Sequence, residues 1–156
     1  MSNYAVKKAK RDSIMLVVEY QKRITCSTDT LLNTLLDHSN LDRFFNAKFK
    51  VLKPANKDEI TGGKGCIRQV SILGVCFEEQ IIQADQTGIC YQVLNDFPVR
   101  QHRGEIHFQK TGEHTQISYR IQCQSPWYIP KFVLKAILQK DIQQCLNRLG
   151  DMYDPR

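Results

Sequence analysis

Long apolar runs are missing from this 156-residue sequence. The apolar stretch nearest the N-terminus, Ile14–Val18, has five residues and ends at Glu19. The core of a secretion signal needs about 7–15 apolar residues, and a membrane helix needs about 20. Internal repeats and low-complexity segments are absent as well. We therefore expect neither a secretion signal nor a membrane span, but a soluble, cytoplasmic protein.

Metal-binding and disulfide motifs are also missing. The four histidines are widely separated and no two cysteines form a C-x-x-C motif, so we expect neither a structural zinc site nor another cofactor. Hydrophobic residues make up 42% of the chain, enough for a core without disulfides. We therefore expect free, mostly buried thiols in a reducing compartment. The cysteines are Cys26, Cys66, Cys76, Cys90, Cys123 and Cys145.

The common catalytic signatures are absent too. There is no G-x-S-x-G nucleophile elbow. The glycine-rich stretch 61–65 lacks the first glycine of a P-loop and the Ser or Thr that follows its lysine. Glu78 and Glu79 are neighbours in a predicted strand, where they point to opposite faces and cannot act as a carboxylate pair. We assign no catalytic residue from these patterns.

The charge is moderately basic, with 22 Lys and Arg against 16 Asp and Glu, a net charge of +6. Half of this excess lies in residues 1–12, where four basic residues accompany one acidic residue, Asp12. Such a tail is either a solvated terminus or a contact for phosphate or anionic lipid. The remaining chain has no basic stripe, so we expect no specific nucleic-acid partner.

Hydrophobic periodicity predicts an α+β fold. Alternation predicts a strand over 14–24, and Leu31, Leu32, Leu35 and Leu36 predict a short helix capped by Ser27 or Thr28. Leu41, Phe44 and Phe45 indicate a second short helical turn. Alternation then predicts strands near 49–52, 65–72, 75–83, 89–94, 99–110 and 114–124.

The last predicted element is a long helix over 126–149, begun by Ser125 and Pro126 and ended by Gly150. Its apolar stripe contains Trp127, Leu134, Leu138, Ile142, Cys145 and Leu149. One amphipathic helix and about seven antiparallel strands favour a curved sheet wrapped around that helix. We expect one domain over 13–150, with tails at 1–12 and 151–156.

The turn at Leu73-Gly74 predicts the register of one hairpin. A two-residue turn there places Val70 opposite Phe77, and Arg68 opposite Glu79. The same face carries Ile72, Val75 and Ile81, so it should face inward and Arg68 should pair with Glu79. This pair is either a polar anchor for a ligand headgroup or a strut that completes the sheet.

Alternation in the other strands directs further polar side chains inward. Tyr20, Tyr91 and Tyr119 are either ligand contacts or ordinary core tyrosines with hydroxyls at the rim. His102 is the one inward histidine, and it is either a general base or a structural residue. His107 and His114 face outward, and His38 falls in a loop, so we expect all three at the surface.

A family resemblance rests on the final helix and on eight residues, which are Gly63, Gly65, Arg68, Glu79, Tyr91, Pro98, Gly104 and Tyr119. In these features the chain resembles the START-like superfamily, also called SRPBCC, whose members share the helix-grip fold of the major birch pollen allergen. The resemblance covers roughly residues 14–150 and is greatest to the polyketide-cyclase/dehydrase and lipid-transport branch. Phe44-Phe45 departs from the Trp of many members.

The resemblance implies an internal cavity between sheet and final helix that holds lipids, quinones, hormones or aromatic polyketides. The primary hypothesis is therefore a binding or transport protein for a hydrophobic small molecule. A cyclase or dehydratase using His102 or the Arg68–Glu79 pair is the second hypothesis. A module that binds ribosomes, chaperones or membranes through its basic surface is the third. The predicted ligand-binding residues are Tyr20, Arg68, Val70, Phe77, Glu79, Tyr91, His102, Tyr119, Leu134, Leu138 and Ile142.

A partner surface is also predicted at the start of the final helix. Ile129 and Phe132, with Ala136, lie on the side opposite the core stripe, and Lys131, Lys135 and Lys140 lie nearby. A basic, partly apolar helix start is suited to transient membrane contact during ligand transfer. The alternative is a few exposed apolar residues without a partner.

Overall fold

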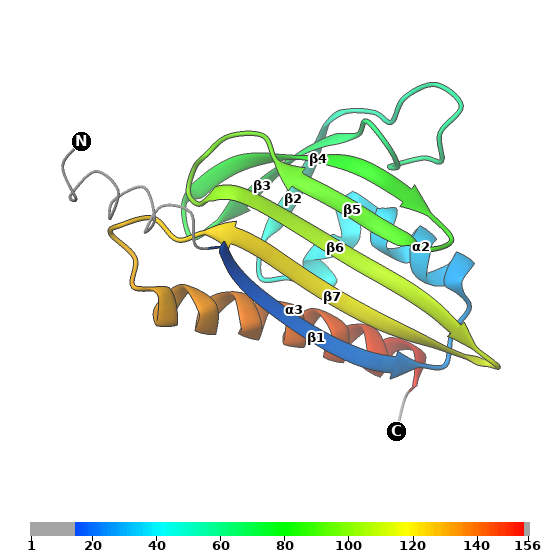
Figure 1. Cartoon of the computed structure of the whole chain (residues 1–156). Helices are drawn as coiled ribbons and strands as arrows, with labels where there is room; N and C mark the ends of the chain where they lie inside the picture. The colour runs from blue at the N-terminus through cyan, green and yellow to red at the C-terminus, as the bar shows by residue number, and fades with distance from the viewer. Residues whose placement is uncertain (1–14, 155–156) are drawn as a thin grey trace, which may run out of the picture.

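A computed structural model of the chain describes residues 15–154. Seven strands form one antiparallel sheet in the order β1-β7-β6-β5-β4-β3-β2. Figure 1 shows the sheet curving over a long C-terminal helix that runs along β1 and β7. The α+β helix-grip architecture expected from the sequence is confirmed. The elements are β1 (Met15–Ile24), α2 (Thr28–Leu36), η1 (His38–Arg43), β2 (Lys48–Lys53), β3 (Ile67–Ile72), β4 (Val75–Asp85), β5 (Gly88–Val93), β6 (Arg100–Thr111), β7 (His114–Gln124) and α3 (Lys131–Tyr153).

The β3–β4 hairpin has the predicted register. Leu73 and Gly74 both have positive φ, 49° and 79°, as a type I′ turn requires. Arg68 pairs with Glu79, and Val70 pairs with Phe77. Because side chains alternate between faces, this register directs both charged residues to the concave face of the sheet.

The two short helices after β1 also follow the predicted pattern. The Ser27 hydroxyl caps α2 by accepting a hydrogen bond from the backbone N–H of Thr30. The four leucines of α2 are buried in the main core. The second helical turn is the 3₁₀ helix η1, which buries Leu41, with Phe44 buried directly after it. Together these residues close one end of the sheet.

Helix α3 differs from the prediction at its start. It begins at Lys131 rather than at 126, with Pro130 as its N-cap. Proline disfavours helical conformation in the residue before it, so the helix cannot continue back through 129. The segment before it is a turn in which the Ser125 hydroxyl donates to the Ile129 carbonyl. Trp127 therefore leaves the predicted core stripe and is 95% exposed.

The prediction for Ile129 was also wrong. Its side chain does not face away from the core but packs, half-buried, against a small cluster that contains Val99, Cys123 and Leu134. The reason is the same turn, which redirects the residues before Pro130 toward the sheet. Phe132, Lys131 and Lys135, which do lie in α3, are exposed as expected.

The predicted stop at Gly150 was wrong too, because α3 continues to Tyr153. Gly150 is a buried helical residue, and a Cβ there would lie 2.4 Å from the Lys22 side chain on β1. Its role is close helix–strand packing rather than helix termination. Residues 151–153 consequently belong to the helix and not to a C-terminal tail, and the hydroxyls of Tyr153 and Thr34 are hydrogen-bonded.

The main core lies between α3, the concave face of the sheet and α2. The buried residues of α3 are Leu134, Ile142, Cys145, Leu146, Leu149 and Gly150. All six cysteines are free thiols, and four of them are buried. Among the helices of residues 15–154, none combines the length and the apolar character that a bilayer span requires. The predicted tail at 1–12 lies outside the described residues.

Leu146 provides a test of this core. Its side chain is 0% exposed, so Leu146→Ala should lower the free energy of unfolding by about 2–5 kcal/mol through lost burial and a residual cavity. Val133→Ala, on the exposed side of the same helix, should change it by about 0.5 kcal/mol or less. Urea denaturation of both variants measures this. Equal losses would contradict the assignment of faces on α3.

Candidate functional site

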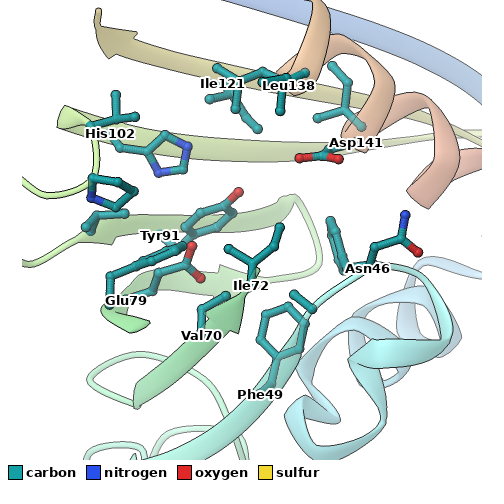
Figure 2. A pocket seen from close by; sticks show the side chains of 18 of the residues that line it. Asn46, Phe49, Val70, Ile72, Glu79, Tyr91, His102, Ile121, Leu138 and Asp141 are labelled. Atoms are coloured by element: carbon teal, nitrogen blue, oxygen red, sulfur yellow. The ribbon is translucent and has the colours of Figure 1, made fainter. Parts of the chain in front are cut away.

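A cavity of about 210 Å³ lies between the concave face of the sheet and the N-terminal half of α3. Strands β3 to β7 line one side, α3 lines the other, and the segment 45–49 and the β5–β6 loop complete the wall. Figure 2 shows side chains from these elements converging on it. The apolar wall is formed by Phe45, Ala47, Phe49, Val70, Ile72, Phe77, Val93, Pro98, Val99, Ile121, Leu134, Ile137, Leu138 and Ile142.

The structure brings ten of the eleven predicted ligand-binding residues to this cavity. They are Arg68, Val70, Phe77, Glu79, Tyr91, His102, Tyr119, Leu134, Leu138 and Ile142. Tyr20 is the exception, because β1 lies against the C-terminal half of α3. The Tyr20 hydroxyl donates to the Asn147 side chain at 3.4 Å instead of facing the cavity. Whether the ten residues bind a ligand remains a prediction.

Arg68 and Glu79 form a buried ion pair in the cavity wall. The Arg68 Nε and Nη2 atoms lie 2.8 Å and 2.7 Å from Glu79 Oε2, and both side chains are 7% exposed. The guanidinium also lies over the rings of Phe49 and Tyr91, 5.2 Å and 5.1 Å from their centroids. Because removing one partner leaves an uncompensated buried charge, breaking such a pair costs about 3–5 kcal/mol.

His38 completes this network and corrects a sequence expectation. It was predicted at the surface, yet it is only 3% exposed. Its Nδ1 lies 3.0 Å from Arg68 Nη1, which can only donate, so Nδ1 accepts. Its Nε2 then donates to the Gly62 carbonyl at 2.7 Å. Burial and the neighbouring Arg68 charge lower the pKa of His38 to about 4.

No local pattern in the sequence indicates this role. His38 lies in the polar stretch Asp37–Asn40, which is typical of a surface break between helices. Its partners come from residues 62 and 68, which reach it only after the chain has folded back. The network of His38, Arg68 and Glu79 therefore depends on tertiary structure.

Tyr91 and Tyr119 form a second buried polar pair, with their hydroxyls hydrogen-bonded to each other. Tyr91 lies opposite Gly104 in the sheet, and a Cβ on Gly104 would lie 2.1 Å from the Tyr91 ring. Gly104 is thus needed for the ring to lie flat across β6. Burial raises the pKa of both phenols, so they act as neutral hydrogen-bonding groups.

Two polar groups of the cavity have no partner within residues 15–154. His102 Nδ1 is buried and makes no hydrogen bond there, and burial lowers the pKa of its imidazole. Asp141, on α3, makes neither a hydrogen bond nor an ion pair to any described side chain or backbone group. Burial raises the pKa of its carboxyl group. Figure 2 shows both side chains directed at the cavity from different elements.

Sequence reasoning missed Asp141, although a signal was present. Asp141 follows Leu134 by seven residues and Leu138 by three, so it lies on the apolar stripe of α3 rather than on its solvated face. A carboxylate inside such a stripe indicates a polar site in a core or a cavity. Within residues 15–154, no three His, Cys, Asp or Glu side chains are grouped to hold a metal ion.

The buried network predicts a pH dependence of stability. Unfolded His38 has a pKa near 6.5, whereas folded His38 has one of about 4. Between these pH values the unfolded state binds a proton at His38 that the folded state does not. The contribution of His38 to the free energy of unfolding therefore falls by about 1.4 kcal/mol per pH unit as the pH drops. His38→Gln should flatten the slope by this amount in denaturation curves from pH 7 to about 4. Parallel curves for the two proteins would contradict the neutral, buried His38.

Comparisons with known proteins bear on the fold. No family model matches the sequence, and no curated protein matches it. Among solved structures, a START superfamily protein from Mycobacterium smegmatis has a TM-score of 0.73 at 12% identity, covering 88% of this chain and 97% of that protein. Ara h 8.0201 has a TM-score of 0.62 at 13% identity, with coverage of 88% and 97%.

A third solved structure is similar over the same region. The protein TTHA0849 from Thermus thermophilus has a TM-score of 0.70 at 14% identity, covering 87% of this chain and 95% of that protein. At sequence identities this low, the TM-scores show a shared backbone architecture and nothing more. The backbone of this chain is similar to all three over most of their length, and the chain therefore has the START/SRPBCC helix-grip fold.

Proposed function

We propose that this protein binds a hydrophobic small molecule in the cavity between the sheet and α3, as a carrier rather than as an enzyme. The observation that supports this most directly is the cavity itself, about 210 Å³ with a largely apolar wall. Protein interiors are close-packed, and voids larger than a water molecule are few. A cavity this large, with a few convergent polar groups, has the composition of a ligand site.

The polar groups of the wall favour binding over catalysis. A cyclase or dehydratase of the kind considered above needs His102 within hydrogen-bond reach of Arg68 or Glu79. Within residues 15–154, no hydrogen bond joins His102 to either residue. Arg68 and Glu79 are instead bonded to each other, and Arg68 is also bonded to His38, so their remaining capacity for proton transfer is small.

The free thiols support a location for this carrier. All six cysteines are unpaired, and such thiols persist in reducing compartments. The proposal therefore includes a cytoplasmic protein that handles its ligand within the cell.

Ligand carriage can be tested by native mass spectrometry of freshly purified protein. We expect a stoichiometric apolar adduct on the wild-type chain. Leu138 projects into the cavity from α3 (Figure 2), so Leu138→Trp should fill it and abolish the adduct. Val133→Trp places the same side chain on the exposed side of α3, outside the cavity lining, and should leave the adduct in place.

The same comparison separates carriage from its rivals. A bare mass for the wild-type protein in several preparations would contradict carriage and favour a module acting through its surface. An adduct retained equally by Leu138→Trp and Val133→Trp would place the bound molecule outside the cavity. Circular dichroism of both variants verifies that each is folded.

The region around the start of α3 supports membrane contact as the route of ligand exchange. Trp127, Tyr128 and Phe132 are exposed there, 95%, 53% and 77% respectively. The Tyr128 hydroxyl donates to the Pro98 carbonyl, which ties this segment to the β5–β6 loop and its exposed Phe97. We call these four aromatic residues the α3 aromatic surface.

The α3 aromatic surface borders the cavity. Pro98 lines the cavity and directly follows Phe97, a member of this surface, in the chain. Lys131 and Lys135 are exposed beside it. Aromatic and apolar side chains next to lysines suit the interface of an anionic bilayer, where rings insert and ammonium groups meet lipid phosphates. The proposed occupant of this surface is therefore an anionic lipid membrane.

Vesicle sedimentation tests the membrane contact. The wild-type protein should bind vesicles that contain phosphatidylserine more tightly than neutral ones, and the Trp127→Ser, Phe132→Ser double variant should lose at least about tenfold in affinity. Met152→Ser is the control, because Met152 is an exposed apolar residue at the opposite end of α3. Binding unaffected by the double variant would contradict this surface, and binding to ribosomes or chaperones instead would favour the interaction module.

A further inference from the structure

The charged and polar groups of the cavity restrict the chemistry of its ligand, on the assumption that the proposed carrier function is correct. Among the described residues that line the cavity, the carboxylate and guanidinium side chains are those of Arg68, Glu79 and Asp141. Arg68 and Glu79 neutralise each other at 2.7 Å. The remaining acidic group is Asp141, so the lining has an excess of negative over positive charge.

The charge of Arg68 is already compensated within the protein. Its Nε and Nη2 are directed at Glu79, and its Nη1 is directed at His38. The rings of Phe49 and Tyr91 lie against its guanidinium as well. These contacts use three of its five N–H groups, and the Glu79 carboxylate neutralises its charge, so a ligand carboxylate or phosphate would compete with Glu79 for that charge.

His102 does not supply a second cation. Its imidazole is neutral because burial disfavours the charged form. A neutral imidazole has one nitrogen that donates and one that accepts, and its buried Nδ1 has no partner among the described residues. A ligand hydroxyl satisfies this atom in either tautomer, since a hydroxyl both donates and accepts.

Asp141 selects for a donor. Its carboxylate is an acceptor without a hydrogen-bonded partner within residues 15–154, directed into the cavity from α3 (Figure 2). A ligand O–H or N–H donor can bond to it, whereas a carboxylate or phosphate would bring a like charge close to it. The two unpartnered groups therefore favour the same kind of ligand.

We infer that the cavity binds a compact apolar molecule whose polar group is a hydrogen-bond donor, a hydroxyl or an amine, and that it rejects fatty-acid carboxylates and phosphorylated lipids. Asp141 and His102 are the residues that recognise the donor. The volume of about 210 Å³ suits a molecule of a few fused rings rather than a long two-chain lipid.

A matched series of two-ring compounds tests this charge selection. The probes are naphthalene, 2-naphthol, 2-naphthylmethylamine and 2-naphthoate, which share one ring system and differ in the polar group. Isothermal titration calorimetry at pH 7 should show 2-naphthol and the amine binding at least about tenfold more tightly than 2-naphthoate. Naphthalene should bind with an intermediate affinity.

Asp141→Asn isolates the source of the selection. The amide keeps the shape of the side chain and removes its charge, so the affinity for 2-naphthoate should rise and the gap to the amine should shrink by about tenfold. Asp151→Asn is the matched control, because Asp151 is exposed near the end of the same helix. It should leave all four affinities unchanged. His102→Leu should weaken 2-naphthol while leaving naphthalene unaffected.

The outcomes distinguish this inference from the proposed function. Binding of all four probes with equal affinity, or tightest binding of 2-naphthoate, would overturn the charge selection and leave the carrier function standing. A preference that persists in Asp141→Asn would overturn the role of Asp141. Failure of every probe to bind, with the three polar probes at about 1 mM and naphthalene at saturation, would contradict the carrier function itself and the inference with it.

Discussion

A single helix has to cover the concave face of a seven-stranded sheet, and it is too narrow to do so. An α-helix with its side chains is about 10–12 Å wide, while neighbouring strands are about 4.8 Å apart, so a helix covers two or three strands. Here α3 packs along β1 and β7. The face formed by β3 to β6 is left partly uncovered, and the cavity lies there. The cavity exists because α3 is narrower than the sheet that it covers.

Buried polar side chains stabilise the uncovered part of the sheet by bonding its strands to one another. Arg68 and Glu79 pair across β3 and β4, and His38 anchors Arg68 to the loop at Gly62. The linked hydroxyls of Tyr91 and Tyr119 join β5 to β7 across the smaller β6 residue Gly104. Each of these groups finds its partner within the protein. These pairings stabilise the fold, because a polar group buried in an apolar wall without a hydrogen bond loses its hydration free energy and gains nothing in return.

The two unpartnered groups of the cavity differ from this pattern. His102 and Asp141 face the same cavity but have no partners within the described residues. The other buried polar side chains of this region are hydrogen-bonded within the protein. They are Arg68, Glu79, His38, Tyr91 and Tyr119. Two open groups in a space large enough for a small molecule are consistent with a ligand that completes their hydrogen bonds, and the α3 aromatic surface beside the cavity is consistent with its exchange at a membrane.

Local patterns in the sequence were sufficient for the sheet and for most of the cavity wall. Alternation has a period of two residues, so it identifies the inward face of each strand, and the Leu73-Gly74 turn sets the register that brings Arg68 opposite Glu79. These features depend on residues close together in the chain. The expectation for ten wall residues relied on them, together with the resemblance to the helix-grip fold.

Other features depend on segments that are distant in sequence, so local patterns could not predict them. Gly150 resembles a helix stop, but packing against Lys22 of β1 keeps it inside α3. His38 resembles a surface residue until Gly62 and Arg68 surround it. Tyr20 alternates correctly, yet the position of α3 over β1 directs it to Asn147 and away from the cavity. Periodicity along the chain established which faces are apolar, whereas the path of α3 across the sheet set which apolar residues form core and which line a cavity.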